Sequence, residues 1–119
     1  MKYKMQYTAI KAYEDATNNN IDSLNRRINE IIPKIEEDII KAANAGFFFT
    51  YFYLDIEKIK EEIHIDSQIN KEITTLLSLI DSILKENLYE TNIDHILSKY
   101  CSKFNNLKYI QIDVYWNVN

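Results

Sequence analysis

The feature that most constrains the fold is a run of apolar residues at three- and four-residue spacing between Ile21 and Ala42. Its members are Ile21, Leu24, Ile28, Ile31, Ile32, Ile35, Ile39 and Ala42. This spacing puts one apolar stripe along a helix, so it predicts a long amphipathic helix with one buried side. Pro33 lies inside the run and lacks an N–H, so we expect a kink near residues 29–32 or a new helix starting at Pro33. The only glycine, Gly46, suits the position just beyond the helix end, where a positive φ is wanted.

Shorter segments flank this helix. Thr8 predicts the cap of a first short helix ending near Ala16, and Asn18–Asn20 is expected to break the chain before the long helix. Residues 55–62 have helical spacing, whereas residues 63–66 alternate like a short strand, and the sequence leaves that stretch open.

Two further helices are predicted in the second half of the chain. Apolar residues recur at helical spacing from Ser67 to about Asn87. Thr91 offers a cap for another helix whose inward residues reach Phe104. Both patterns predict amphipathic helices that need a surface to pack on.

Two segments predict strands. Phe47–Leu54 is rich in aromatic residues and apolar on both alternating faces, which favours a central strand. At the C-terminus, one alternating set holds Ile110, Ile112, Val114, Trp116 and Val118, and the other holds Tyr109, Gln111, Asp113, Tyr115 and Asn117. This alternation predicts a half-buried strand with Trp116 largely buried. Together the segments predict an α+β fold, with a long N-terminal helix and further amphipathic helices packed on a small, mainly antiparallel sheet.

Composition narrows the functional classes. A chain of 119 residues with 46% hydrophobic residues fits one domain, residues 1–119. One glycine leaves no material for a glycine-rich phosphate loop, and we expect no cofactor. A net charge of -4 with two arginines opposes binding to extended nucleic acid. Met1–Gln6 is not followed by an apolar stretch, and the longest uncharged run, Ala42–Leu54, is shorter than the roughly 20 residues of a membrane span. With one cysteine, Cys101, the cytoplasm is the expected location and no membrane partner is expected.

Three residues carry side chains that often do chemistry, yet none has the neighbours it would need. His64 has Asp66 two residues away and His95 follows Asp94, but no third metal ligand is suggested. Cys101 falls towards the C-terminal end of a predicted helix, where the helix dipole raises rather than lowers the pKa of a thiol. We therefore expect no catalytic or metal site, and a chain that is not an enzyme.

The candidates for binding are two arginines and two tyrosines. Arg26 and Arg27 form the only arginine pair and would suit an anionic ligand or acidic partner, although solubility or a local salt bridge to Glu30 is the simpler explanation. On the predicted helix both lie away from the core. Tyr51 and Tyr53 belong to the aromatic strand and could contact a partner or stack on a base, while core packing is the simpler explanation.

Several segments together resemble a group of small bacteriophage proteins. The quoted pieces are Thr8-Ala9-Ile10-Lys11-Ala12, the helix end Ile39-Ile40-Lys41-Ala42-Ala43-Asn44-Ala45-Gly46 before an aromatic strand, and the final Ile112-Asp113-Val114-Tyr115-Trp116. The similarity covers roughly the first 54 and last 15 residues, and the chain departs from the pattern between Asp55 and Lys108. This resemblance implies a phage accessory protein in the cytoplasm of the host cell.

Size, aromatic content and resemblance lead to one main expectation about function. The chain is expected to act by stoichiometric binding, either occupying a host protein to antagonise host defence or sequestering a small signalling nucleotide. The alternative is a virion-associated or structural protein that builds an oligomer. Because both faces of Phe47–Leu54 are apolar, we expect a homo-oligomer in which a second copy covers one face.

Overall fold

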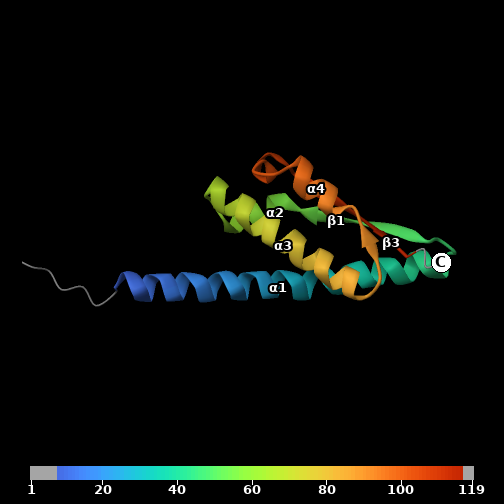
Figure 1. The fold of residues 1–119 in the computed structure, drawn as a ribbon, viewed down its shortest axis with the longest axis horizontal. Helices are drawn as coiled ribbons and strands as arrows, with labels where there is room; N and C mark the ends of the chain where they lie inside the picture. Colours follow the sequence, from blue (N-terminus) through green and yellow to red (C-terminus); the bar gives the residue numbers. More distant parts are fainter. Residues whose placement is uncertain (1–7, 117–119) are drawn as a thin grey trace, which may run out of the picture.

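The computed structural model describes residues 8–116, apart from the side chains of residues 20 and 21. The elements, in order, are α1 (Ala9–Asn44), β1 (Phe49–Asp55), α2 (Ile56–Glu62), α3 (Asp66–Glu86), β2 (Glu90–Thr91), α4 (Ile93–Lys99), a 3-10 turn (Phe104–Asn106) and β3 (Tyr109–Tyr115). The strands form an antiparallel sheet in the order β1-β3-β2 (Figure 1). The predicted α+β class, with a long N-terminal helix and a small antiparallel sheet, is confirmed.

The 36-residue helix α1 begins and ends where the sequence predicts helix signals. The Thr8 hydroxyl accepts a hydrogen bond from the Lys11 N–H at 3.3 Å, which caps the first turn. Gly46 follows the end of the helix with φ +87°, in the region that glycine adopts without strain. The Thr8 cap and the role of Gly46 are therefore confirmed.

The predicted break at Asn18–Asn20 is wrong, and so is the alternative of a new helix starting at Pro33, while the kink near residues 29–32 stays a prediction. The helix continues through Asn18–Asn20, because an asparagine lowers helix propensity by at most about 0.7 kcal/mol. No new helix starts at Pro33. Pro33 and Asn29, whose carbonyl loses its donor, are both exposed, so water can satisfy that carbonyl.

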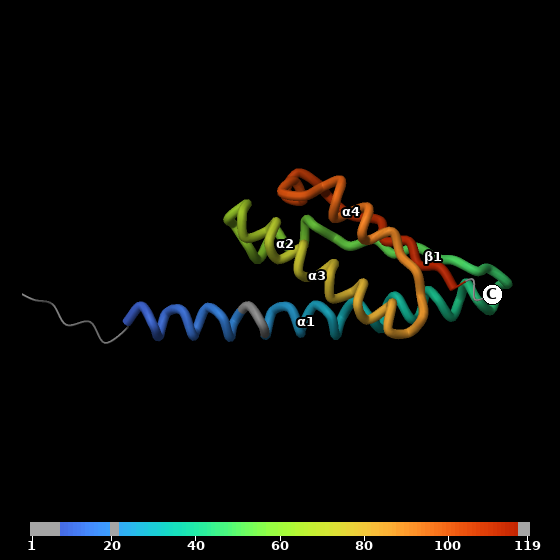
Figure 2. The backbone as a smooth tube through the Cα atoms, in the orientation of Figure 1, coloured from blue at the N-terminus to red at the C-terminus, as the bar shows by residue number. Residues whose placement is uncertain are grey.

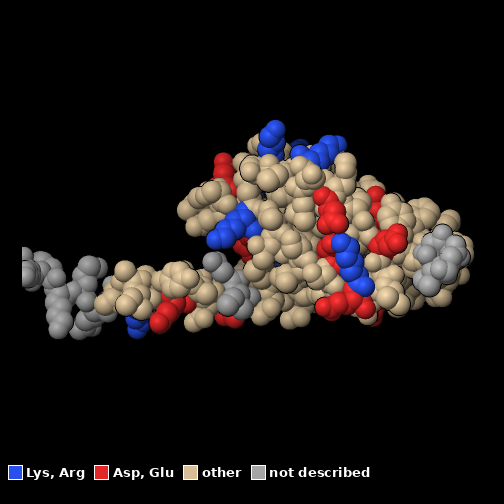
Figure 3. All heavy atoms as spheres, viewed as in Figure 1, with Lys and Arg blue, Asp and Glu red and all other residues tan. Residues whose placement is uncertain are grey.

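The N-terminal part of α1 projects beyond the rest of the protein (Figures 1 and 2). The molecule measures 73 × 25 × 23 Å as a result. On this projecting part, Ile10 and Tyr13 are 73% and 74% exposed. The space-filling view shows the same narrow arm, and the charged side chains on that face lie mainly over the helices (Figure 3).

The core lies between the helices and the inner face of the sheet. α3 contributes its centre, where Ile73, Leu76, Leu77 and Ile80 are fully buried. α1 contributes Ile31, Ile35 and Ile39, and β3 contributes Ile110, Ile112 and Val114. The predicted stripe of the long helix is confirmed as buried at these three α1 residues and as partly buried at Leu24, Ile28, Ile32 and Ala42, while the side chain of Ile21 lies outside the described residues. The predicted buried face of the C-terminal strand is confirmed at Ile110, Ile112 and Val114.

The order of the strands differs from the prediction. β3, not the aromatic segment, is the central strand, and β1 lies at an edge of the sheet. β1 begins at Phe49 rather than Phe47, and only one of its faces is covered by helices. The prediction failed because apolar alternation reports which residues share a face, and it does not report which strands lie side by side.

The remaining boundaries need smaller corrections. Of the stretch 55–62, Ile56–Glu62 forms a helix, α2, and Asp55 ends β1, whereas residues 63–65 are a connector rather than a strand. α4 stops at Lys99, so Phe104 lies in the separate 3-10 turn. Trp116 follows the end of β3 and is half-buried, packed edge-to-face on Tyr89, rather than largely buried. Val118 lies outside the described residues. Among the described helices, none combines the length and apolar character that a membrane crossing requires.

Candidate binding surfaces

The outer face of the sheet, turned away from the helices, is aromatic. β1 contributes Phe49, Tyr51 and Tyr53, and β3 contributes Tyr109 and Tyr115. Between 40% and 61% of each of these residues is exposed. We call these five side chains the aromatic face.

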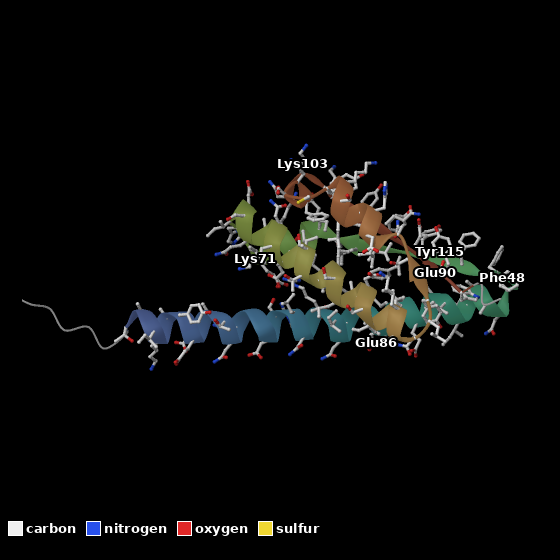
Figure 4. The ribbon with its side chains drawn as sticks, in the orientation of Figure 1. Phe48, Lys71, Glu86, Glu90, Lys103 and Tyr115 are labelled. Atoms are coloured by element: carbon white, nitrogen blue, oxygen red, sulfur yellow. The ribbon has the colours of Figure 1, made fainter. Side chains whose placement is uncertain are left out.

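Three rings of the aromatic face pack against one another. Tyr53 contacts Tyr51 at 5.4 Å and Tyr109 at 5.2 Å between ring centroids, both edge-to-face. Phe49 lies opposite Tyr115 in the strand register, at the same end of the molecule as Phe48 (Figure 4). An aromatic side chain offers on the order of 200 Å². Five half-exposed rings therefore approach or exceed the few hundred Å² that a soluble monomer usually exposes in one patch.

Two acidic residues lie on β2 and β3 of the sheet that carries the aromatic face. Asp113 lies between Tyr109 and Tyr115 on β3, and Glu90 of β2 lies opposite Tyr115. None of the residues of β1, β2 or β3 is a lysine or arginine. The face therefore combines aromatic rings with negative charge.

Asp113 is held in place by its neighbours. Gln111 Nε2 and Asn92 Nδ2 donate to its two carboxylate oxygens at 2.8 and 3.2 Å. Its own N–H donates to Asn92 Oδ1 at 2.8 Å. Burial, followed by the charge and hydrogen bonding of Asp113, raises the pKa of Tyr115. The Tyr115 hydroxyl therefore lies beside a carboxylate that its neighbours hold in place.

The free edge of β1 is a second surface. Trp116 N donates to Phe48 O and Ile56 N donates to Lys108 O, both at 3.0 Å, so the even-numbered residues of this segment hydrogen-bond to the β3 side. In an antiparallel ladder the alternate residues direct their N–H and C=O groups the other way. The backbone groups of Phe49, Tyr51 and Tyr53 therefore point away from β3.

A groove runs along this free edge. One wall is β1 from Thr50 to Asp55, and the other is a stripe of α1 residues three or four positions apart, from Arg27 to the C-cap Ala45. The groove contains cavities of about 520 and 250 Å³. Ala42 and Ala45 leave the wider of the two open. We call this the β1 groove.

The arginine pair is divided by the fold. Arg27 is only 6% exposed and binds Glu62 at 2.8 Å and Glu72 at 3.4 Å, so the prediction that it lies away from the core is wrong. Arg26 does lie outside, and binds Glu62 at 2.6 Å rather than the predicted partner Glu30. The prediction failed because the acceptors, Glu62 and Glu72, belong to α2 and α3. The spacing of residues along α1 does not indicate which residues of other helices lie beside it.

The cavity beside Arg27 has a volume of about 300 Å³ and lies where α1 meets α2 and α3. Burial raises the pKa of Glu62, but the hydrogen bond from Arg26 and the charges of both arginines lower it more, so the net shift is downward. Ser23 Oγ also donates to Glu72 at 3.1 Å. Both guanidinium groups are thus already paired with carboxylates, so an anionic ligand would have to compete with those carboxylates for them.

The other chemically interesting residues lie elsewhere. His64 is in the connector between α2 and α3, so it does not share a strand face with Asp66, which begins α3. His95 is exposed on α4, and Cys101 is exposed just after α4, 3.8 Å from the Ser102 hydroxyl. Within residues 8–116, no cluster of three His, Cys, Asp or Glu residues could hold a metal ion.

The structure places the two tyrosine candidates on the aromatic face and adds three residues that sequence reasoning missed: Tyr109, Asp113 and Tyr115. The signal for them was present, because they form the outward half of the C-terminal alternation, which carries two tyrosines. Comparisons of the chain with protein-family models, with curated proteins and with solved structures find no match.

Proposed function

We propose that this protein acts by stoichiometric binding, and that its aromatic face binds a protein surface rich in lysine or arginine. The observation that carries the proposal is the combination of five half-exposed rings with neighbouring carboxylates and no basic residue on the strands. Aromatic rings attract cations through their faces, and a fixed carboxylate adds a charged acceptor. Tyrosine is also among the residues that contribute most to binding energy at protein interfaces.

The same charge pattern orders the alternatives. A signalling nucleotide would bring phosphates towards Asp113 and Glu90, and the arginines that could attract it are already paired. Nucleotide sequestration is therefore the weaker version of the proposal. The stronger version is an accessory protein of the phage type that occupies a host protein, with no catalytic step assigned to the chain.

A structural role remains the second candidate. It is favoured by one specific observation, the unpaired edge of β1, which offers a site for assembly rather than for a foreign protein. The experiment below separates these two candidates, because a structural protein would capture copies of itself.

Site-specific photocrosslinking in cells of the natural host tests the proposal. A photoreactive phenylalanine analogue at position 109 should give one major adduct, with the mass of this chain plus one other protein that carries a basic surface. The matched control places the same analogue at position 13, which is at least as exposed but lies on the projecting part of α1. Adducts of equal yield at both positions, or adducts of the chain with itself alone, would contradict binding of a foreign protein by the aromatic face.

A further inference from the structure

The two edges of the sheet differ in how far they discourage pairing with another strand. β2 is two residues long and carries Glu90, so it is short and charged. β1 is seven residues long, and Phe49–Leu54 contains no charge and no proline. Natural sheets normally protect an edge of this kind with charges, bulges or a covering segment. Among the described strands, β2 has such protection in its own residues and Phe49–Leu54 has none.

From this contrast we infer that β1 pairs antiparallel with β1 of a second copy across a two-fold axis, so that two three-stranded sheets become one six-stranded sheet. The inference rests on the edge of the sheet and is independent of the partner proposed for the aromatic face. The N–H and C=O groups of Phe49, Tyr51 and Tyr53 point to this edge and would be satisfied by the second strand.

A second copy suits the edge better than an unrelated strand because the edge is self-complementary. With the axis at Tyr51, each Tyr51 faces its counterpart and each Phe49 faces a Tyr53, which are favourable aromatic pairs. Asp55 lies beyond the paired region, so no like charges meet. The association also closes on itself, because the outer edges of the six-stranded sheet would both be the protected β2.

The β1 groove has room for the incoming strand. Neighbouring antiparallel strands place opposite residues on the same face, so Thr50 and Phe52 of the second copy would enter the groove beside the small side chains Ala42 and Ala45. Thr50 and Phe52 are only half-buried in a single copy. Half-exposed aromatic residues carry on the order of 100 Å² each, so the four of the β1 edge (Phe49, Tyr51, Phe52, Tyr53) offer on the order of 400 Å² per copy, and the wall of the groove adds to this towards the roughly 800 Å² per partner of a standard interface.

Pairing would also join the two aromatic faces. Both copies would present Phe49, Tyr51 and Tyr53 on the same side of the six-stranded sheet, with the carboxylates towards its outer strands. The dimer would therefore offer a continuous acidic and aromatic platform with twice the area of a single copy.

Amide hydrogen exchange combined with sedimentation equilibrium tests the inference on the intact protein. A dimer of the 14.2 kDa chain is expected, in which the amides of Phe49, Tyr51 and Tyr53 exchange as slowly as those of Thr50, Phe52 and Leu54. A persistent monomer would overturn the inference. A dimer in which the three odd-numbered amides exchange rapidly would also overturn it, because the copies would then meet through another surface.

Two variants give the matched comparison. Tyr51→Pro removes an N–H that points to the free edge and leaves the β1–β3 ladder intact, so it should weaken dimerisation about 30-fold or more, since both bonds of the central pair are lost. Tyr109→Lys alters an aromatic residue on the same face but on the central strand, and should leave the dimer intact.

Tyr51→Lys provides a variant that introduces no proline. It sets two like charges opposite each other across the axis and should also shift the protein towards monomer, more strongly at low salt. If Tyr51→Lys remains as dimeric as the unaltered chain, the two-fold pairing is wrong. Crosslinking from position 109 to a foreign protein can succeed or fail independently of this result.

Discussion

The two faces of the sheet are built from the same strands and meet very different surroundings. On the inner face of β3, Ile110, Ile112 and Val114 are at most 3% exposed, whereas on its outer face Tyr109 is 61% exposed. On β1 both faces are apolar, yet only the inner one is covered. Apolar character alone therefore did not decide burial. The helices did, because α1 and α3 pack on one side only.

The difference between the faces has a chemical basis. The inner face of β3 uses aliphatic side chains, which have no group that water can satisfy. The outer face relies mainly on tyrosines, whose hydroxyl groups stay hydrated while the rings remain available. A surface of this kind tolerates solvent when it is free and gains energy when a partner covers it. This is the property expected of a binding face rather than of an incomplete core.

The largest effect should come from the inner face. Ile112→Ala removes a fully buried side chain at the centre of the sheet, and should lower the free energy of unfolding by about 2 to 5 kcal/mol, because a cavity is left behind. Urea denaturation followed by circular dichroism measures it. The matched variant Tyr109→Ala on the same strand should cost less than about 1 kcal/mol, since its ring is largely exposed. Similar losses of unfolding free energy for the two variants would show that the two faces do not differ in how much they stabilise the fold.

A smaller contrast of the same kind separates the two neighbouring arginines. Arg27→Met keeps the length of the side chain but leaves Glu72, whose side chain is 11% exposed, without its guanidinium, and should cost about 2 to 4 kcal/mol. Arg26→Met removes a pair on the outside and should cost less than about 1 kcal/mol. Urea denaturation of both variants gives the comparison. Equal losses would show that Arg27 is not held by Glu62 and Glu72.

Much of the fold could be predicted from the sequence, for identifiable reasons. The stripe of α1 and the alternation of β3 follow directly from burial on one side, and both were predicted correctly. The continuity of α1 through Asn18–Asn20 was not, because local propensity costs are small compared with what the packed part of the helix supplies. β1 lies at an edge of the sheet because β3 pairs between β1 and β2. β3 is far from β1 in the sequence, and local patterns do not indicate such pairing.

The candidate surfaces were predictable only in part. The aromatic segment predicts Tyr51 and Tyr53 as binding candidates, and both lie on the exposed face of the sheet. Tyr109 and Tyr115 are not predicted as binding residues, because the C-terminal alternation assigns them only to the solvent-facing side of a strand. The sequence predicts Arg27 on the outside because the pattern describes the faces of α1 alone. In the structure, Glu62 of α2 and Glu72 of α3 pair with Arg27.

The smallest expected effect is a pH dependence at Glu62, which connects the inner and outer arginines. Burial raises the pKa of this carboxyl, but the two arginines lower it more, so in the folded protein its pKa lies below the ordinary value of 4.5. A lowered pKa means that the folded state binds its proton less readily than the unfolded chain. The stabilisation is therefore present above about pH 4.5 and is lost as the pH falls through the folded pKa.

Thermal melts of Glu62→Gln should show a lower Tm than the unaltered chain at pH 7, and the difference should shrink towards zero below that window. Glu61→Gln on the same helix is the control, since Glu61 makes no ion pair among the described residues, and its Tm should follow the unaltered chain throughout. A Glu62→Gln difference that stays constant down to pH 3 would show that the carboxylate charge does not join the arginine pair to α2.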